Sequence, residues 1–192
     1  MTSDNNRPFE YLGVNHVALV SRDMAETVDF YDGLLGMKLV KTLDLPGGRG
    51  QHFFFDCGGG ATIAFFWFPH APPAAPGIAS MHADVRRMGS QTAHASMNHL
   101  AISIPLDKFD EYAERLRAKG VTLSIINHED SEAHASPTVT DKTWIRSMYF
   151  RDPNGIHMEL AALTRSYKAS DVSHDPVNAK GERRPRRVVA HA

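Results

Sequence analysis

The alternation of apolar and polar residues predicts a strand, a helix and three more strands in the first half of the chain. Val14–Val20 is an apolar, β-branched segment typical of a strand. Asp23 followed by Glu26 is the signature of a helix N-terminus, and apolar residues then recur at helical spacing until Gly36. Three further segments are typical of short strands: 38–43, 52–57 and 62–67. The predicted unit is βαβββ.

The second half repeats this order. A strand is expected over 101–104, a helix from Leu106 to Gly120, and further strands over 121–126, 146–150 and 156–161. The run Asn15-His16-Val17-Ala18-Leu19 returns as Asn98-His99-Leu100-Ala101-Ile102, which indicates an internal duplication. A polar stretch over 127–143 predicts a longer loop in the second copy. We therefore expect an α+β fold built from tandem βαβββ modules.

Composition outside the two modules predicts the domain boundaries. Four prolines follow the first module, and proline cannot donate a ladder hydrogen bond, so this connection is expected to be a lid or an arm with a short helix over 83–87. The end of the chain is polar and basic, which favours a flexible tail. The expected division is an N-terminal extension (1–11), the first module (12–68), the Pro-rich connection (69–97), the second module (98–163) and the tail (164–192).

Charge and cysteine content limit the classes of partner. The 192 residues include 21 Lys and Arg against 22 Asp and Glu, so the chain has no strong overall field for nucleic acid. The longest strongly apolar run, Ile63–Phe68, is far shorter than the ~20 residues of a membrane helix. Cys57 is the single cysteine, and the polar start does not resemble a secretory signal. We expect a cytoplasmic protein that binds neither nucleic acid nor membranes.

Three residues are candidate ligands of a metal ion. His16 and His99 occupy equivalent positions in the two copies, and two modules packed around a pseudo-twofold axis would bring them together. Glu159 lies in an apolar strand segment, where a buried carboxylate needs a charged partner or a cation. The equivalent residue of the first copy is Ala64, which has no donor atom. The predicted metal site therefore has three protein ligands: His16, His99 and Glu159.

Two longer motifs carry a resemblance to a known superfamily. Asp23–Met37 reads D-x6-F-Y-x3-L-G-M, and Tyr149–Glu159 reads Y-F-R-D-P-N-G-I-H-M-E. Together with the repeated Asn-His they resemble the vicinal oxygen chelate superfamily, which contains glyoxalase I, bleomycin and fosfomycin resistance proteins and type I extradiol dioxygenases. The resemblance covers Leu12–Leu163. It implies that the two βαβββ modules form an eight-stranded open cup with a metal inside.

The number of ligands separates the classes within this superfamily. Glyoxalase I and the related epimerases supply four protein ligands, with Glu or Gln where this chain has Ala64. Extradiol dioxygenases supply two His and one Glu, which leaves adjacent positions on Fe(II) open for a catechol and dioxygen. The resemblance therefore implies a ring-cleavage dioxygenase with Fe(II), or with Mn, Zn or Ni in its place, acting on a catechol-like aromatic diol. The alternatives are a glyoxalase-like lyase or isomerase that stabilises an enediolate, and a non-catalytic binding protein of the bleomycin-resistance type.

The resemblance also implies residues around the metal. Tyr149 matches a family tyrosine whose hydroxyl contacts a substrate oxygen. Two histidines that the dioxygenases carry at other positions are missing from this chain. His157, His134 or His52 could take over the role of acid or base. Residues expected to contact an aromatic, anionic substrate are Phe54, Phe66 and Arg146. We expect a homodimer or a higher oligomer.

Overall fold

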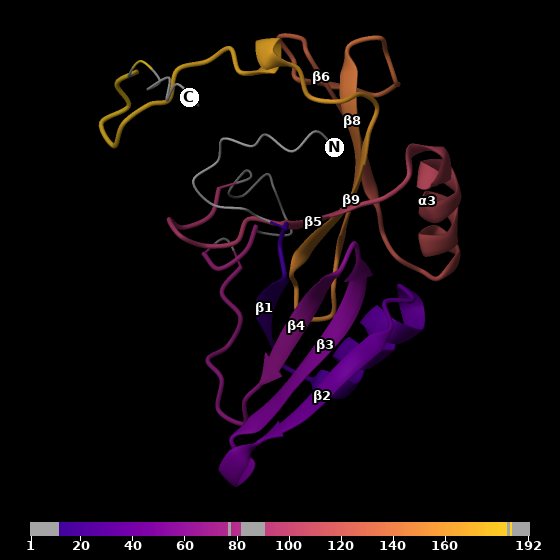
Figure 1. Cartoon of the computed structure of the whole chain (residues 1–192), viewed down its shortest axis with the longest axis vertical. Coiled ribbons are helices and arrows are strands. Elements are labelled where there is room, and N and C mark those ends of the chain that lie inside the picture. Colours follow the sequence, from indigo (N-terminus) through magenta and orange to yellow (C-terminus); the bar gives the residue numbers. More distant parts are fainter. Residues whose placement is uncertain (1–11, 77, 82–90, 184, 186–192) are drawn as a thin grey trace. The chain divides into compact units, whose positions relative to one another are not determined.

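A computed structural model describes residues 12–76, 78–81, 91–183 and 185 (Figure 1). The expected N-terminal extension, the short helix over 83–87 and the last residues of the tail lie outside the described residues. Two compact units are distinguished, Val14–Arg165 and a smaller unit made of the two ends of the chain. The larger unit contains both predicted modules, and it carries the candidate site.

The first module is a four-stranded sheet with a short helical segment on one face. Its elements are β1 (His16–Ser21), α1 (Met24–Val28), η1 (Asp29–Leu34), β2 (Leu39–Leu45), η2 (Pro46–Gly48), β3 (Gly50–Gly58) and β4 (Ala61–Trp67). The strand order is β1-β4-β3-β2, and β1 runs parallel to β4. The predicted cap is confirmed, since the Asp23 carboxylate accepts the N–H of Glu26 at 3.0 Å. The predicted helix is present, and its second part, Asp29–Leu34, is the π-helix η1 that continues α1.

The second module repeats this arrangement with one addition. It contains β5 (Leu100–Ser103), η3 (Leu106–Lys108), α3 (Phe109–Ala118), β6 (Ser124–Glu129), β7 (Ala135–Ser136), β8 (Thr143–Arg151) and β9 (His157–Leu163). The strand order is β5-β9-β8-β6-β7, with β5 parallel to β9. The short strand β7 lies within the stretch expected to be a loop. The α+β prediction with two βαβββ modules is confirmed, as two open sheets.

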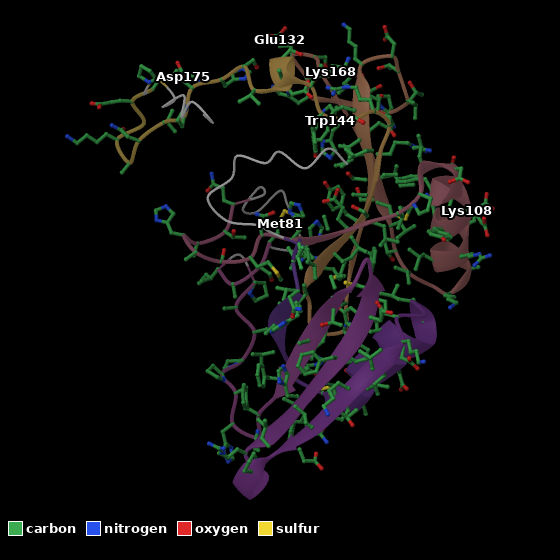
Figure 2. All side chains as sticks on the ribbon, in the orientation of Figure 1. Met81, Lys108, Glu132, Trp144, Lys168 and Asp175 are labelled. Carbon is green, nitrogen blue, oxygen red and sulfur yellow. The ribbon has the colours of Figure 1, made fainter. Side chains whose placement is uncertain are left out.

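The helices cover one face of each sheet and leave the other face open. Tyr31, at the centre of the core, contacts the rings of Phe55 and Phe65, and Phe109 and Leu116 of α3 are buried against the second sheet. Lys108, which directly precedes α3, is exposed (Figure 2). Its Nζ atom lies 3.2 Å from the Glu111 carboxylate. Because successive strand residues alternate between faces, the residues next to these core positions point to the open faces. His16 and Phe54 lie on the open face of the first sheet; His99, Tyr149 and Glu159 lie on that of the second.

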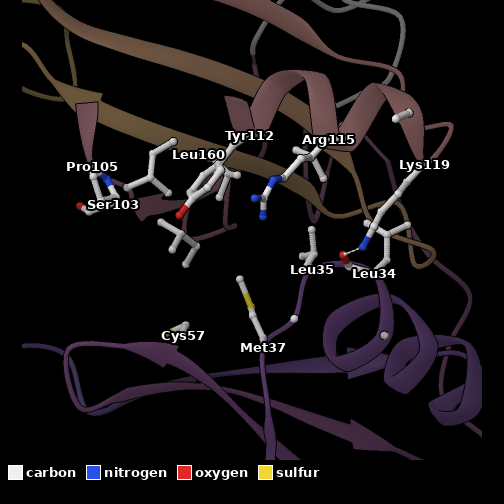
Figure 3. Close-up of a pocket in the computed structure, with 16 residues that line it drawn as sticks. Leu34, Leu35, Met37, Cys57, Ser103, Pro105, Tyr112, Arg115, Lys119 and Leu160 are labelled. Atoms are coloured by element: carbon white, nitrogen blue, oxygen red, sulfur yellow. Dashed lines mark hydrogen bonds between the residues drawn. The ribbon is translucent and has the colours of Figure 1, made fainter. Parts of the chain in front are cut away.

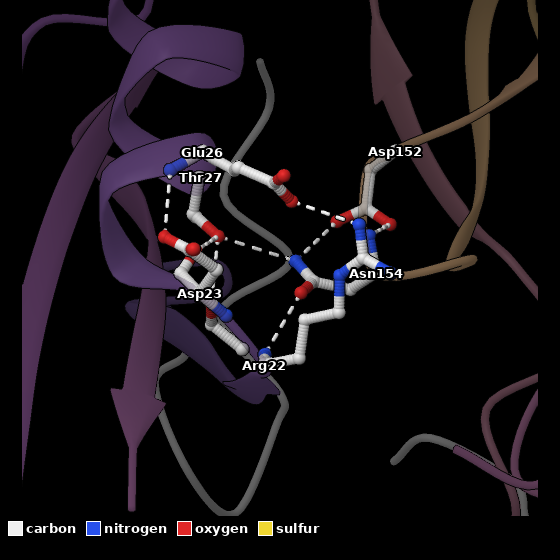
Figure 4. Close-up of polar contacts among 7 residues, drawn as sticks. Arg22, Asp23, Glu26, Thr27, Asp152 and Asn154 are labelled. Atoms are coloured by element: carbon white, nitrogen blue, oxygen red, sulfur yellow. Dashed lines mark hydrogen bonds and ion pairs between the residues drawn. The ribbon is translucent and has the colours of Figure 1, made fainter. Parts of the chain in front are cut away.

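A polar turn between β8 and β9 joins the two modules (Figure 4). The Asp152 carboxylate accepts N–H groups of Asn154 and Ile156 at 2.9 and 2.7 Å and the Tyr31 hydroxyl at 3.2 Å. Asn154 accepts the N–H of Arg22 at 2.9 Å and donates to the Thr27 hydroxyl at 3.3 Å. Burial raises the pKa of Asp152, and these hydrogen bonds oppose the rise. The turn that precedes β9 is therefore positioned by the first module.

The smaller unit contains little regular structure among its described residues. A 3₁₀ turn, η4, spans Ala169–Asp171, and Val177 and Arg183 form an isolated bridge. Among the described residues, no helix has the length and apolar character needed to cross a membrane.

Candidate functional site

Two of the predicted metal ligands meet on the open face of the second sheet. Parallel pairing of β5 with β9 sets Ala101 beside Glu159, so His99 reaches the same face. The distance between His99 Nε2 and Glu159 Oε2 is 3.1 Å, and the Ser147 hydroxyl donates to Glu159 Oε1 at 2.5 Å. The Glu159 side chain is only 6% exposed, whereas that of His99 is 38% exposed. A nearly buried carboxylate thus shares an open face with an accessible imidazole.

This donor set is suited to a divalent cation. A buried carboxylate is costly unless it is paired or coordinates a cation. Imidazole nitrogen and carboxylate oxygen are ligands common to iron, manganese, nickel and zinc sites. Ser147 resembles the outer hydrogen-bond partners that orient carboxylates in metal centres. His99 and Glu159 could therefore hold two positions of such an ion.

The third predicted ligand, His16, does not join this pair. His16 lies at the start of β1, where its ring packs edge-on to Phe54 at a centroid distance of 5.8 Å. Within the described part of the chain, no three His, Cys, Asp or Glu side chains gather closely enough to hold one ion. The structure therefore presents two separate sets of donors, one on each sheet.

The two histidines share one local geometry. His16 Nδ1 lies 2.8 Å from Asn15 Oδ1, and His99 Nδ1 lies 2.9 Å from Asn98 Oδ1. The Asn-His motif recognised in the sequence is thus also repeated as a hydrogen bond. In both copies the Nε2 atom is the one not engaged by the asparagine.

A row of aromatic rings extends from His16 along the first sheet. His52 stacks on Phe66 at a centroid distance of 3.6 Å and is tilted against Phe54 at 4.3 Å, and Phe66 stacks on Phe68 at 5.4 Å. Burial lowers the pKa of His52, with a smaller contribution from the nearby charge of His16. Phe54 and Phe66, expected to contact substrate, therefore share one face with His16.

Tyr149 and His157 lie beside the His99–Glu159 pair. Their rings are stacked at 5.1 Å, and each meets the His99 ring edge-on, at 6.0 and 6.2 Å. Burial lowers the pKa of His157 to about 4, with smaller contributions from the charges of Arg151 and His99. The Nδ1 atom of His157 is buried without a hydrogen-bond partner. Burial raises the pKa of Tyr149, so its phenol stays protonated near neutral pH.

His128 also lies in this site, although its sequence pattern did not predict it. Its Nε2 atom lies 3.1 Å from the Tyr149 hydroxyl, and it belongs to β6. The polarity of the segment from Asn127 onward predicts a loop, but pairing with β8 keeps the first residues of this segment in a strand. Extending the alternation of β6 by one more pair of residues would have placed His128 on the same face as Tyr149.

These side chains line a pocket of about 600 Å³. Ile126, Leu123 and Met81 contribute apolar surface to it. Its polar lining residues include His99, His128, Tyr149, Arg151 and His157. The pocket is large enough for a small aromatic molecule.

Two predicted site residues lie elsewhere. Arg146 faces the helix-covered side of the second sheet, where its guanidinium pairs with Asp110 at 2.8 Å and lies 4.1 Å from the Phe109 ring. This position does not support contact with a substrate on the open face. His134 is exposed in the turn between β6 and β7, with φ of 56°, and it is not among the residues that line the pocket.

A second cavity, of about 700 Å³, lies between the end of η1 and α3 (Figure 3). Leu35, Met37 and Leu160 give it an apolar lining, and Lys119 closes one side by donating to the Leu34 carbonyl at 2.6 Å. None of the predicted site residues lines this cavity. It is separate from the candidate metal site.

Two βαβββ modules, each with an open sheet, place the chain in the class of proteins built on this duplicated scaffold. The sequence profile of the glyoxalase/bleomycin resistance protein/dioxygenase superfamily matches residues 13–160. The chain belongs to this superfamily, as the motifs indicated.

Solved structures agree with this fold. A glyoxalase family protein from Enterococcus faecalis matches with a TM-score of 0.54 at 18% identity, covering 78% of this chain and 96% of that one. The fosfomycin resistance protein FosX from Listeria monocytogenes matches with a TM-score of 0.50 at 22% identity, covering 79% and 94%. At these identities the similarity concerns the fold alone.

Proposed function

We propose that the chain is a metal-dependent enzyme of the vicinal oxygen chelate type, and that its reaction is extradiol cleavage of a catechol-like aromatic diol. The observation that carries the proposal is the His99–Glu159 pair with Tyr149 and His128 beside it. With His16 contributed by a second copy of the chain, His99 and Glu159 would complete a set of two histidines and one carboxylate. Such a set leaves coordination positions open for a bidentate ligand and dioxygen.

Ala64 supports three protein ligands over four. It is fully buried on β4 and offers no side-chain donor at the position where four-ligand relatives carry one. A fourth position on the ion would then be open to a substrate oxygen. This feature favours the dioxygenase over the glyoxalase-like lyase.

The surrounding side chains provide the remaining chemistry. A bound Fe(II) would supply Lewis acidity and electron transfer to dioxygen. Tyr149, kept protonated by burial, can donate its hydroxyl proton to a substrate oxygen, and His128 Nε2 can return a proton across the 3.1 Å contact. The stacked rings of Tyr149 and His157 form a flat wall for an aromatic ring.

We further propose that a second copy of the chain completes the site. His99 and Glu159 hold two positions, while His16 lies on the open face of the other sheet. The open face of the first sheet also carries exposed apolar side chains, including Val20 and Leu43 at 51% and 39% exposure. A dimer that seats these faces on one another would bury them and join His16 of one copy to the pair of the other.

The test is anaerobic loading with Fe(II), followed by oxygen-electrode and absorbance measurements with substituted catechols. We expect oxygen uptake, a yellow ring-fission product, and one iron per chain. The variant Glu159→Gln should lose the iron and the activity, because a neutral amide is a poor ligand. Glu129→Gln, on strand β6 of the same sheet, is the matched control and should keep both.

Three outcomes would contradict the proposal. Iron retained at the wild-type level by Glu159→Gln would exclude the metal site. A metal-loaded protein that converts a hemithioacetal without consuming oxygen would instead favour the glyoxalase-like lyase. Stoichiometric binding of an aromatic compound with neither metal nor turnover would favour the non-catalytic binding protein.

A further inference from the structure

The repeated asparagine before each candidate ligand has no role in the function proposed so far. Strand alternation explains why His16 and His99 reach open faces, but it does not explain why Asn15 and Asn98 precede them. In both copies the asparagine Oδ1 lies within hydrogen-bond distance of the imidazole Nδ1, at 2.8 and 2.9 Å. Because the same contact occurs in both modules, we expect the two asparagines to have the same role.

The chemistry of the contact assigns a proton. An amide oxygen only accepts, so the imidazole nitrogen facing it carries the hydrogen. A neutral imidazole has one N–H, and its other nitrogen then holds a lone pair. With Nδ1 protonated, Nε2 of each histidine is the nitrogen able to coordinate a metal.

The contact between His99 and Glu159 places Nε2 beside a second acceptor. The Glu159 carboxylate only accepts, so across 3.1 Å either a hydrogen on His99 Nε2 or a cation lies between Nε2 and Oε2. In the metal-free protein Nε2–H can donate to Glu159, and a bound ion would take the place of that hydrogen while Nδ1–H continues to donate to Asn98. The two side chains are therefore oriented toward one shared position.

Asn98 is itself held in place. Its side-chain NH2 lies 3.5 Å from the Thr92 hydroxyl, and its carbonyl accepts the N–H of Met81 at 3.2 Å. The carbonyl of Asn15 accepts the N–H of Thr62 on β4 at 3.0 Å. Each asparagine is therefore anchored through its backbone, so that its side chain can orient the neighbouring ring.

We infer that Asn15 and Asn98 are positioning residues that fix His16 and His99 as the Nδ1–H tautomer and aim both Nε2 atoms at the metal. The inference rests on the proposed metal site, but the tautomer can be observed in the metal-free protein. This role also explains why the residue before each histidine is the neutral asparagine and not an acidic residue. Asparagine directs the ring without adding charge, so two imidazoles, one carboxylate and a divalent ion keep a single net positive charge, which favours an anionic oxygen ligand.

The experiment records long-range proton–nitrogen correlation spectra of nitrogen-15-labelled, metal-free protein at pH 8, with titration calorimetry of Co(II) alone. The variants are Asn98→Leu and Asn15→Leu, with Asn98→Asp and Asn15→Asp as the variants that keep the acceptor. In the wild type and both aspartate variants we expect Nδ1–H at His16 and His99. Each leucine variant should lose that signature at its own histidine only, so the other copy serves as the internal control.

Affinity for Co(II) should fall about 10- to 100-fold in the leucine variants and stay within about threefold in the aspartate variants. Unchanged tautomers in the leucine variants would overturn the inference, whatever the metal does. Altered tautomers with unchanged Co(II) affinity would also overturn it, because the asparagines would then not aim the ligands. A wild type with the expected nitrogen signals but no Co(II) binding would support the tautomer assignment and overturn the proposed metal site.

Discussion

At the scale of single residues, the pair of Tyr31 and Asp152 is the most informative buried contact outside the candidate site. The Tyr31 side chain is fully buried, and its hydroxyl donates to the Asp152 carboxylate at 3.2 Å and approaches the Met158 sulfur at 3.4 Å. Burial, followed by the charge of Asp152, raises the pKa of Tyr31 well above its ordinary value. Tyr31 therefore links the core of the first module to the turn that precedes β9.

This contact predicts a pH-dependent effect of Tyr31→Phe. Near pH 7 the variant should be less stable by about 1–2 kcal/mol, because the carboxylate loses a buried donor. The native chain keeps a phenol proton that the unfolded chain releases above pH ~10, so the wild-type advantage is present below that pH and falls as the pH rises. The loss should approach about 1.4 kcal/mol per pH unit.

Urea unfolding at pH 7, 9 and 10.5 measures this difference. Tyr167→Phe is the control, because that side chain is 67% exposed in the smaller unit. A difference between wild type and Tyr31→Phe that stays constant through pH 10.5 would argue against the raised pKa.

The sequence predicted some residues of the candidate site and not others. His99, Glu159 and Tyr149 were predicted from a repeat and a motif, and the structure brings them together. His128 was missed because polar residues after Ile126 resemble a loop, although pairing with β8 keeps them in a strand. Arg146 was expected near substrate, but its alternation on β8 directs it to α3.

At the scale of elements, helix and strand boundaries could be predicted where a short stretch of sequence determines them. Asp23 fixed the start of α1 through its cap, and strand alternation located the strands to within a few residues. The π-helix η1 and the short strand β7 could not be predicted in this way. Apolar spacing does not distinguish a π-helical turn from an α-helical one, and β7 is only two residues long and pairs with β6 across a short polar turn.

The start of β3 gives a prediction at this scale. Gly50 has φ of 139°, and a Cβ added there would lie 2.0 Å from the Trp67 carbonyl oxygen of β4. Gly59, in the β3–β4 turn, also has a positive φ, of 63°, but a Cβ there would have nothing within 4 Å. Gly50→Ala should therefore cost about 3 kcal/mol or more, against about 1 kcal/mol for Gly59→Ala.

Chemical denaturation of the two variants under identical conditions tests the difference. Failure of Gly50→Ala to fold, with Gly59→Ala folded, would agree with the close approach of β3 and β4. Equal losses of stability in the two variants would show that the positive φ alone determines the loss, and that the close contact with the Trp67 carbonyl does not contribute.

At the scale of the whole molecule, the proposed dimer makes a prediction about mixed chains. If His16 of one copy completes the pair of another, His16→Ala and Glu159→Ala chains should each fail to bind metal alone. In a mixed dimer, however, the Glu159→Ala chain supplies His16 and the other chain supplies His99 and Glu159. Refolding an equimolar mixture should therefore restore about a quarter of the sites, since about half of the dimers are mixed and each has one intact site.

Co(II) absorption of the refolded mixture provides the readout. Two Glu159→Ala preparations mixed with one another are the control and should stay empty. A mixture of the two different variants that binds no more Co(II) than its components would indicate that each site is completed within one chain.

The turn at Asp152 has a consequence for how one module depends on the other. When the two repeats are aligned, Cys57 and Gly59 of the first copy correspond to Asp152 and Asn154 of the second. Only the second copy therefore has the side chains that hydrogen-bond to the other module. Their partners in the first module are Arg22, Thr27 and Tyr31. The two halves are thus unequal in this contact, and a second module on its own would leave the turn at Asp152 without the three groups of the first module that position it.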